Sequence, residues 1–325
     1  MKRRIARILP WVITAIALFL AFRSVEWDSL LRHFRAANLQ LLAAAVGCTC
    51  LSYLFRARRW LFLFPERVPV YLDSLRVLIL GFFMNNILPA RTGELVRAHL
   101  GSKITGSTRT LVLATIASER LVDGLTISLM FVVFALGLGG EEYSQELLWV
   151  AYLFAAVALG VAVTLSFRGF LFRITKRLKE RHHSRAAQYT LGRVEIFIDG
   201  LAPLFYKSRA PVIVLWSLVV WGIELIVFMA VGCAYGVDLG VHLGVLFLVA
   251  VNFSSLIPAG PGGIGVVEFV ATAVLVSVGL DREVALAMVL SQHMIQYLVI
   301  GVSGAWSMLR WKGQVLEAEA EISSA

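Results

Sequence analysis

Two polar interruptions in otherwise apolar sequence constrain the fold of this chain more than any other feature. The first, GFFMNNILPARTGELVRAHL, covers residues 81–100, and the second, SSLIPAGPGGIGVVEF, covers residues 254–269. Both contain the pattern [IL]-P-A-x-x-G, at 88–93 and at 257–262. Breaks at corresponding places in the two halves of a membrane protein are a sequence sign of a transport site. We therefore expect the two breaks to lie close together and to line a polar cavity.

The composition places this chain in a membrane. Of its 325 residues, 59% are hydrophobic and 16% are charged, and the mean hydropathy is +0.80. These values exclude an ordinary soluble domain and indicate a polytopic membrane protein. Cys48, Cys50 and Cys233 all lie in apolar runs, so we interpret them as small hydrophobic residues and expect no disulfide, metal site or cofactor.

The net charge of +9 is explained by topology. Basic residues flank the apolar runs, as the positive-inside rule requires for cytoplasmic ends, so no nucleic-acid partner is expected. Segment 168–209 holds ten Lys or Arg against three Asp or Glu and is predicted to be cytoplasmic, with the apolar face of 191–201 along the membrane surface. The same rule predicts a multi-pass protein of the cell membrane with both termini in the cytoplasm.

The apolar runs predict an all-α polytopic membrane protein with six full spans and two re-entrant broken hairpins. The spans are expected at about 8–22, 39–55, 111–138, 148–167, 211–235 and 284–309, and the hairpins at 75–105 and 241–279. The resulting divisions are an N-terminal span with its external connection (1–38), a first unit (39–138), an extra span with the basic loop (139–210), a second unit (211–311) and a disordered acidic tail (312–325). The two units have the same order but opposite orientation, which predicts an inverted repeat.

The first break supplies candidate ligands for a lipid headgroup. Its polar residues include Asn86, Arg91, Glu94 and Arg97. Glu94 and Arg97 are three apart and can pair on one helical face. That pairing would leave the other arginine free, and arginine is well suited to bind a phosphate through two hydrogen bonds.

A second cluster follows in the next span, at Glu119, Arg120 and Asp123. Two carboxylates facing one cavity could act as a proton site. Alternatively, the three residues form salt bridges that lock this helix to the first hairpin. Both interpretations remain open at the level of sequence.

The second break is rich in glycine. Gly262 and Gly263 permit positive φ angles and close approach, and a helix beginning near Ile264 would direct free N–H groups, which attract anions, at the cavity. The alternative is a tight packing turn between helices. Glu268 is expected to face the same cavity, and His293 and Gln296 are expected to form hydrogen bonds between helices.

These motifs resemble the transmembrane, flippase-like region of lysylphosphatidylglycerol synthases. The resemblance rests on NNILPARTGELVR (85–97), SERLVD (118–123) and PAGPGGIGVVE (258–268), and it covers about residues 39–311. It implies a helical membrane domain that moves a phospholipid between leaflets, with the candidate residues of all three motifs near the headgroup. The soluble synthase domain of that family has no counterpart here after Trp311, which puts a lysyl-lipid substrate in doubt, and relatives fused to glycosyltransferases make a lipid-linked sugar another candidate.

We therefore expect a flippase or transporter, not an enzyme, for an anionic or aminoacylated phospholipid or a lipid-linked precursor. The sequence contains no G-x-x-x-x-G-K-[ST] nucleotide loop, so energy must come from a gradient or from lipid supply. One alternative is a non-transporting partner of a lipid- or glycan-synthesising enzyme, recruited through the basic loop. Another is an intramembrane lipid-modifying enzyme that uses Glu119 and Asp123 as acid and base.

Overall fold

The computed structural model describes residues 2–65, 68–88, 92–134, 167–181, 184–255 and 259–324, with residue 257 and a few isolated positions between 149 and 163. In these ranges all regular secondary structure is helical, as predicted. The helices are α1 (Lys2–Phe22), α2 (Trp27–Ala36), α3 (Leu39–Phe62), α4 (Tyr71–Ile87), α5 (Gly93–Thr105), α6 (Arg109–Val132), α8 (Arg168–Arg181), α9 (Arg185–Gly200), α10 (Ala210–Ala234), α11 (Gly240–Ser254), α12 (Val266–Ser277) and α13 (Arg282–Ser324), with short 3-10 turns η3 (Ala202–Phe205) and η4 (Pro261–Gly263).

Local sequence signals account for several helix ends. Asn38 caps α3 by accepting the backbone N–H groups of Gln40 and Leu41, as short polar side chains do at helix N-termini. Helix α4 ends at Ile87, two residues before a proline that disfavours helical backbone in the residue preceding it. Helix α5 ends at Thr105 and is followed by Gly106, whose φ of 66° places it in the left-handed region, where glycine carries no steric cost.

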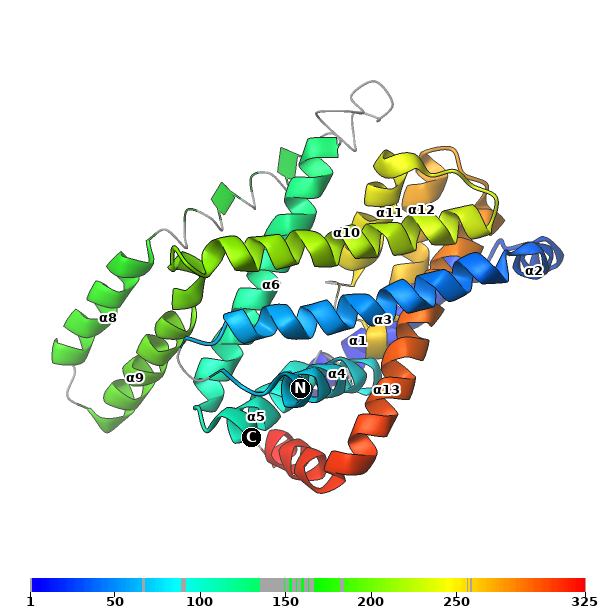
Figure 1. Ribbon diagram of the computed structural model, residues 1–325. Coiled ribbons are helices and arrows are strands. Elements are labelled where there is room, and N and C mark those ends of the chain that lie inside the picture. The colour runs from blue at the N-terminus through cyan, green and yellow to red at the C-terminus, as the bar shows by residue number, and fades with distance from the viewer. Residues whose placement is uncertain are drawn as a thin grey trace.

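Helices α3 and α10 run side by side in opposite directions through the centre of the molecule (Figure 1). At one end the backbone N–H of Asn38 donates to the carbonyl of Ala234 at 2.8 Å. At the other end the guanidinium of Arg209 donates to the carbonyl of Phe64. This long antiparallel contact joins the two predicted units.

Each predicted hairpin is present as a pair of packed helices, α4 with α5 and α11 with α12. In the first pair the approach is close, because a Cβ on Gly93 would lie 2.2 Å from the carbonyl oxygen of Gly81. Helix α4 also packs against η4, the turn of the second break. The expected proximity of the two breaks is therefore confirmed.

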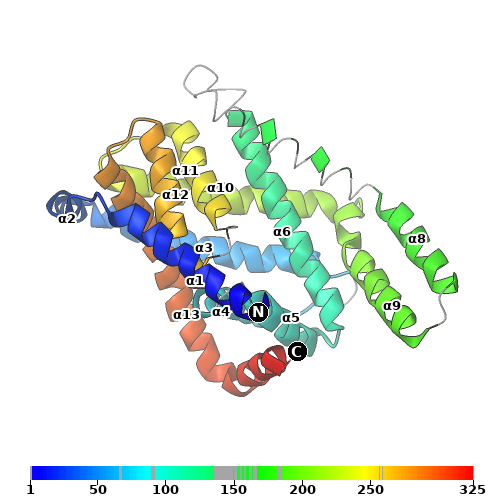
Figure 2. The same cartoon turned by 180° about the vertical axis from the view of Figure 1, so that it is seen from behind.

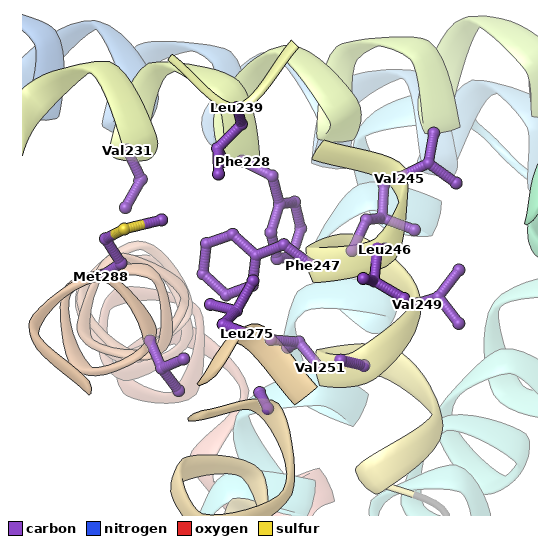
Figure 3. Packing of buried hydrophobic residues seen from close by; sticks show 14 of the residues in the cluster. Phe228, Val231, Leu239, Val245, Leu246, Phe247, Val249, Val251, Leu275 and Met288 are labelled. Atoms are coloured by element: carbon purple, nitrogen blue, oxygen red, sulfur yellow. The ribbon is translucent and has the colours of Figure 1, made fainter. Parts of the chain in front are cut away.

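The largest hydrophobic core joins α10, α11, α12 and α13 (Figure 3). Phe228 of α10 and Phe247 of α11 meet edge to face, with ring centroids 4.8 Å apart. Leu275 of α12 and Met288 of α13 pack in the same cluster. A second core surrounds the buried Trp60 and holds α3, α4, α5 and α6 together.

Helix α1 lies across the second hairpin, as seen from behind in Figure 2. Thr14 accepts the backbone N–H of Gly260 through its hydroxyl oxygen at 2.8 Å. A Cβ on Gly265 would lie 2.9 Å from the Thr14 carbonyl oxygen. Helix α1 then bends by 85° into α2.

Three helices are long and apolar enough to cross a membrane: Leu39–Phe62, Ala210–Ala234 and Arg282–Leu309. The bent pair Leu9–Phe22 and Trp27–Ala36 would make a fourth if it is one broken span. The predicted span 111–138 corresponds to α6 over its described part, whereas most of 148–167 lies outside the described residues. The count of six spans and the repeat stay predictions.

One local prediction was wrong. The tail 312–325 was expected to be disordered, but α13 continues past a kink at Trp311 to Ser324. Its Glu- and Ala-rich sequence has high helix propensity, which explains the difference. Of the α9 face predicted to lie along the membrane surface, Ile198 is buried and Val194 is exposed. The helix also packs on α6, where a Cβ on Gly200 would lie 2.4 Å from that of Ala114, and its place at the membrane surface stays a prediction.

Candidate functional site

The charged residues of the first break and of α6 meet in the interior. Arg97 of α5 donates from Nη1 to Oε1 of Glu119 at 3.0 Å and from Nη2 to Oε2 at 2.6 Å. Both side chains are buried, with exposed fractions of 2% and 0%. A two-point contact of this kind is the strongest form of arginine–carboxylate pairing.

The surroundings of Arg97 fit the guanidinium closely. Its Cζ lies 4.1 Å from the ring centroid of Trp60, within the range of a cation–π contact. A Cβ on Gly81 of α4 would lie 2.9 Å from the Cβ of Arg97, so glycine is needed there for the arginine to fit. Trp60 is itself held by a hydrogen bond from Nε1 to Oγ1 of Thr115, at 3.0 Å.

Glu94, one turn earlier on α5, pairs with Arg120 of α6. Nε of Arg120 donates to Oε1 of Glu94 at 2.9 Å. The side chains of this pair are 34% and 29% exposed, in contrast to the buried Arg97–Glu119 pair. The Arg120 guanidinium also lies 5.2 Å from the ring centroid of Phe82.

These pairings correct the expectation drawn from spacing. Glu94 and Arg97 do not pair with each other, because each has a partner on α6. Arg97 is therefore not available to bind a phosphate in this conformation. Arg91, the other arginine considered, lies outside the described residues.

Asp123 joins the α6 cluster to α3 and α10. Its Oδ1 accepts from Nη1 of Arg59 at 2.6 Å and from Nε1 of Trp221 at 2.9 Å. Nη1 of Arg56 lies 3.7 Å from its Oδ2. Glu119 and Asp123 thus have separate arginine partners, which agrees with the salt-bridge interpretation of this cluster.

Glu224 of α10 extends the same network toward α13. Its Oε1 accepts from the hydroxyl of Ser52 at 2.6 Å and from Nη2 of Arg56 at 3.2 Å. Its Oε2 accepts from Nε2 of Gln296 at 3.3 Å, and Tyr53 donates to Oε1 of Gln296 at 2.8 Å. The predicted interhelical hydrogen bonding of Gln296 is confirmed.

The network is balanced in formal charge. Its four arginines and four carboxylates are Arg56, Arg59, Arg97, Arg120, Glu94, Glu119, Asp123 and Glu224. An unpaired charge at membrane depth is costly, and mutual pairing removes most of that cost. Among these pairs, Arg120–Glu94 is the most exposed to solvent.

Arg56 and Arg59 directly follow the span predicted at 39–55, where basic residues were expected to flank the apolar run, but both side chains lie in the interior. Arg59 is fully buried and Arg56 is 7% exposed. A sequence signal does exist: Ser52, Arg56 and Arg59 repeat at positions i, i+4 and i+7, as do Ser217, Trp221 and Glu224. These spacings place each set on one helical face, and the two faces meet where α3 crosses α10.

The second break forms a tight turn. Gly262, Gly263 and Gly265 have φ angles of 62°, 77° and 86°, which favour glycine over any other residue. A Cβ on Gly262 would lie 1.6 Å from the hydroxyl oxygen of Tyr297. The prediction of positive φ at Gly262 and Gly263 is confirmed.

Helix α12 begins at Val266, and its N-terminus already holds a carboxylate. Oε2 of Glu268 accepts the backbone N–H of Gly265 at 2.6 Å. Glu268 is buried, and its Oε1 lies 2.6 Å from Nδ1 of His293. The expectation of an N-terminus open to an external anion is therefore not met in this conformation, and the predicted hydrogen bonding of His293 between helices is confirmed.

Asn86 is the remaining candidate from the first break. It is half-buried in the last turn of α4, the helix that packs against η4. Gly262 and Gly263 are likewise half-buried. Asn86 and these glycines thus come from the two elements through which the breaks meet.

Comparison with known proteins agrees with this architecture. The family described as lysylphosphatidylglycerol synthase TM region matches residues 7–304. A UPF0104 membrane protein of Pyrococcus horikoshii is 23% identical over 92% of this chain and 94% of its own length. A UPF0104 membrane protein of Methanothermobacter thermautotrophicus is 24% identical, over 93% of this chain and 94% of its own.

A longer protein is also similar to the chain. Glycosyltransferase AglD of Haloferax volcanii is 25% identical over 94% of this chain, which spans 54% of that protein. The family match covers nearly all of both predicted units, including the two breaks and the α6 cluster. This chain therefore belongs to the lysylphosphatidylglycerol synthase transmembrane-region family of multi-pass membrane proteins.

Proposed function

We propose that this protein moves a phospholipid or a lipid-linked precursor between the leaflets of the cell membrane. The lipid headgroup exchanges partners with the Arg120–Glu94 pair at the first hairpin. The observation that carries the proposal is the partial exposure of this ion pair, 34% and 29%, next to the buried Arg97–Glu119 pair.

An accessible ion pair suits a headgroup with charges of both signs. Arg120 supplies guanidinium donors for a phosphate, and Glu94 supplies an acceptor for an ammonium group. When such a headgroup enters, the contact between Arg120 and Glu94 breaks and two contacts replace it, one from Arg120 to the phosphate and one from Glu94 to the ammonium group. An aminoacylated or amine-bearing phospholipid fits this arrangement better than a lipid with a phosphate alone.

A groove between α4 and α13 offers a path for an acyl chain. It has a volume of about 720 Å³ and is lined by Leu75, Arg76, Ile79, Val302, Ser303, Ala305, Trp306, Ser307 and Leu309. Its volume is in the range of ligand pockets, and its lining is mainly apolar, with Arg76 as its one charged residue. The charge distribution predicts that this groove opens toward the cytoplasmic leaflet, where we place both chain termini.

The contacts between helices support an inverted repeat as the moving framework. In the first unit α3 packs on α4, α4 on α5 and α5 on α6, and in the second unit α10 packs on α11, α11 on α12 and α12 on α13. Across the units, α4 packs on α13 and α6 on α11. Repeats of this kind alternate access by rocking about the site between them.

The test is movement of headgroup-labelled lipids between leaflets of proteoliposomes. We expect protein-dependent movement that prefers amine-bearing phospholipids and that falls at least about tenfold in Arg120→Gln and in Glu94→Gln, since each loses a charge-assisted contact worth about 1.5–3 kcal/mol. Lys179→Gln, which removes the partly exposed Lys179–Glu195 bridge between α8 and α9, is the matched control and should keep native movement. If the folded protein moves none of the lipids offered, the proposal is wrong.

A second candidate function is that of a membrane partner for a separate enzyme. It is favoured by the relative named glycosyltransferase AglD, in which a region similar to this chain makes up about half of the protein. On this proposal the chain is not itself an enzyme, and the basic α8–α9 pair is its docking element. Deleting residues 168–200 would then abolish activity in cells, whereas Arg120→Gln would not.

A further inference from the structure

A histidine outside the charge-balanced network bridges two parts of the second hairpin. His293 of α13 has Nδ1 2.6 Å from Oε1 of Glu268 on α12. Its Nε2 lies 3.2 Å from the carbonyl oxygen of Gly262 in η4. The side chains of His293 and Glu268 are 12% and 6% exposed.

Both ring nitrogens thus face oxygen acceptors. A neutral imidazole carries one N–H and can donate only once. To make both hydrogen bonds, the pair needs two protons: either a doubly protonated ring beside an ionised Glu268, or a neutral ring beside a protonated Glu268. With one proton fewer, one of the two nitrogens presents a lone pair to an oxygen.

We propose that Glu268 and His293 form a proton-binding site, and that the bound proton holds the glycine-rich turn in the conformation described here. The loaded pair has no net charge, which suits a buried position. Loss of the proton leaves the pair with one negative charge. The remaining ring proton then lies on Nδ1, toward Glu268, and the Nε2 lone pair faces the carbonyl oxygen of Gly262. The hydrogen bond that held the turn at Gly262 is lost. The two groups titrate as one unit.

Within the part of the chain that the structure describes, no other charged side chain forms a hydrogen bond or ion pair with His293 or Glu268. Helix α2 packs on α13, but its charged residues Asp28, Arg32 and Arg35 are exposed. Within the described residues, α12 contributes Glu268, and α13 contributes the phenol of Tyr297. The Tyr297 ring meets the imidazole edge to face, with ring centroids 4.9 Å apart, and its hydroxyl donates to the Pro261 carbonyl at 3.2 Å. The charged residues that α4 brings to its contact with α13, Asp73 and Arg76, pair with each other. On α3, α5 and α10, which also pack on α13, Arg56, Arg59, Glu94, Arg97 and Glu224 are paired within the network described above.

The turn that this proton holds is the one through which the two hairpins meet, because α4 packs on η4. Helix α1 contacts the same turn through Thr14 and Gly260. Release of Gly262 would therefore loosen the contact between the hairpins. This inference rests on the proposed lipid movement, and it identifies the proton as the ion that biases the protein between the two conformations of that movement.

The test is a titration of the native chain in lipid nanodiscs, followed by NMR of ¹⁵N-labelled histidine rings. The chain has six histidines, and the signals absent from His293→Gln identify the ring of interest. We expect one proton to leave the pair in a single transition as the pH is raised, because two groups joined by a short hydrogen bond titrate together. His242→Gln, in the neighbouring helix α11, is the matched control and should leave this titration unchanged.

A spin label reports whether the turn responds. Ile264 is 40% exposed beside the turn, so a label on Ile264→Cys, with Cys48, Cys50 and Cys233 replaced by serine, reads the mobility of the turn. We expect the mobility of the label to increase as the pH rises, with the same midpoint as the ring titration. In His293→Gln the mobility should no longer depend on pH.

The outcomes separate this proposal from the proposed transport. A proton count that stays constant over the whole pH range in which the protein remains folded, or label mobility that does not follow the titration, overturns the proton site and leaves lipid movement standing. Titration with a responding label in a protein that moves no lipid overturns the transporter proposal and leaves the proton site standing. Lipid movement that is equal with and without an imposed proton gradient would overturn the assignment of the proton as the biasing ion.

Discussion

Arg97 and Glu119 form a two-point salt bridge between α5 and α6, with hydrogen bonds of 3.0 and 2.6 Å and almost no exposure to solvent. Arg97 is also stacked on Trp60 and fitted against Gly81. The geometry indicates that this pair holds the first hairpin against α6. The headgroup contact in our proposal is therefore the neighbouring pair, Arg120–Glu94.

Breaking the buried pair on one side should destabilise the protein. Arg97→Met leaves the Glu119 carboxylate buried without its main partner, and removing one member of a buried pair costs about 3–5 kcal/mol. The double variant Arg97→Met with Glu119→Leu should regain most of that stability, because no isolated charge remains. Thermal unfolding of the purified protein in detergent measures both, and an Arg97→Met variant as stable as the native chain would contradict the structural assignment.

The exposed pair should behave in the opposite way. Arg120→Gln and Glu94→Gln remove partners that are about a third exposed, and exposed ion pairs contribute only about 0–1 kcal/mol. Their unfolding temperatures should stay close to native while lipid movement falls. Unfolding and movement measured on the same preparations test this, and a large loss of stability in either variant would show that the pair is structural.

Asp123 should be essential for joining α6 to α3. Asp123→Asn leaves Arg59 and Arg56 without that charge, so we expect a loss of about 3–5 kcal/mol, as for other broken buried pairs. Asp73→Asn is the matched control, since its bridge to Arg76 is 37% exposed on the aspartate side. Comparable unfolding temperatures for the two variants would mean that Asp123 does not stabilise the junction.

Two glycines of α13 should respond differently to alanine. A Cβ on Gly304 would lie 2.4 Å from Cγ of Phe83 on α4, whereas a Cβ on Gly301 meets no atom within 4 Å. Gly304→Ala should therefore destabilise the α4–α13 contact by about 1–3 kcal/mol through overpacking. Gly301→Ala should be neutral or stabilising by up to about 1 kcal/mol, because alanine favours helix. Equal unfolding temperatures for the two variants would show that α13 is not held against α4 at this position.

The sequence by itself determined where the helices break and which segments form hairpins. Apolar run lengths, Pro89 and the glycines of 260–265 predicted α4 with α5 and α11 with α12, close to their observed bounds. These are local properties, because a proline or a positive φ acts on the residues next to it. The family resemblance likewise rested on local motifs, and the match over residues 7–304 confirmed it.

Tertiary structure decided which charges meet. Spacing alone allowed Glu94 to pair with Arg97, but helix packing gave Glu94 to Arg120 and Arg97 to Glu119. Packing also buried Arg56 and Arg59, which follow the span predicted at 39–55 and were expected only to flank it. The physical reason is that spacing along one helix places several opposite charges within reach of each arginine. Packing against a helix that is distant in sequence then selects the partner that is shielded from water and therefore interacts most strongly.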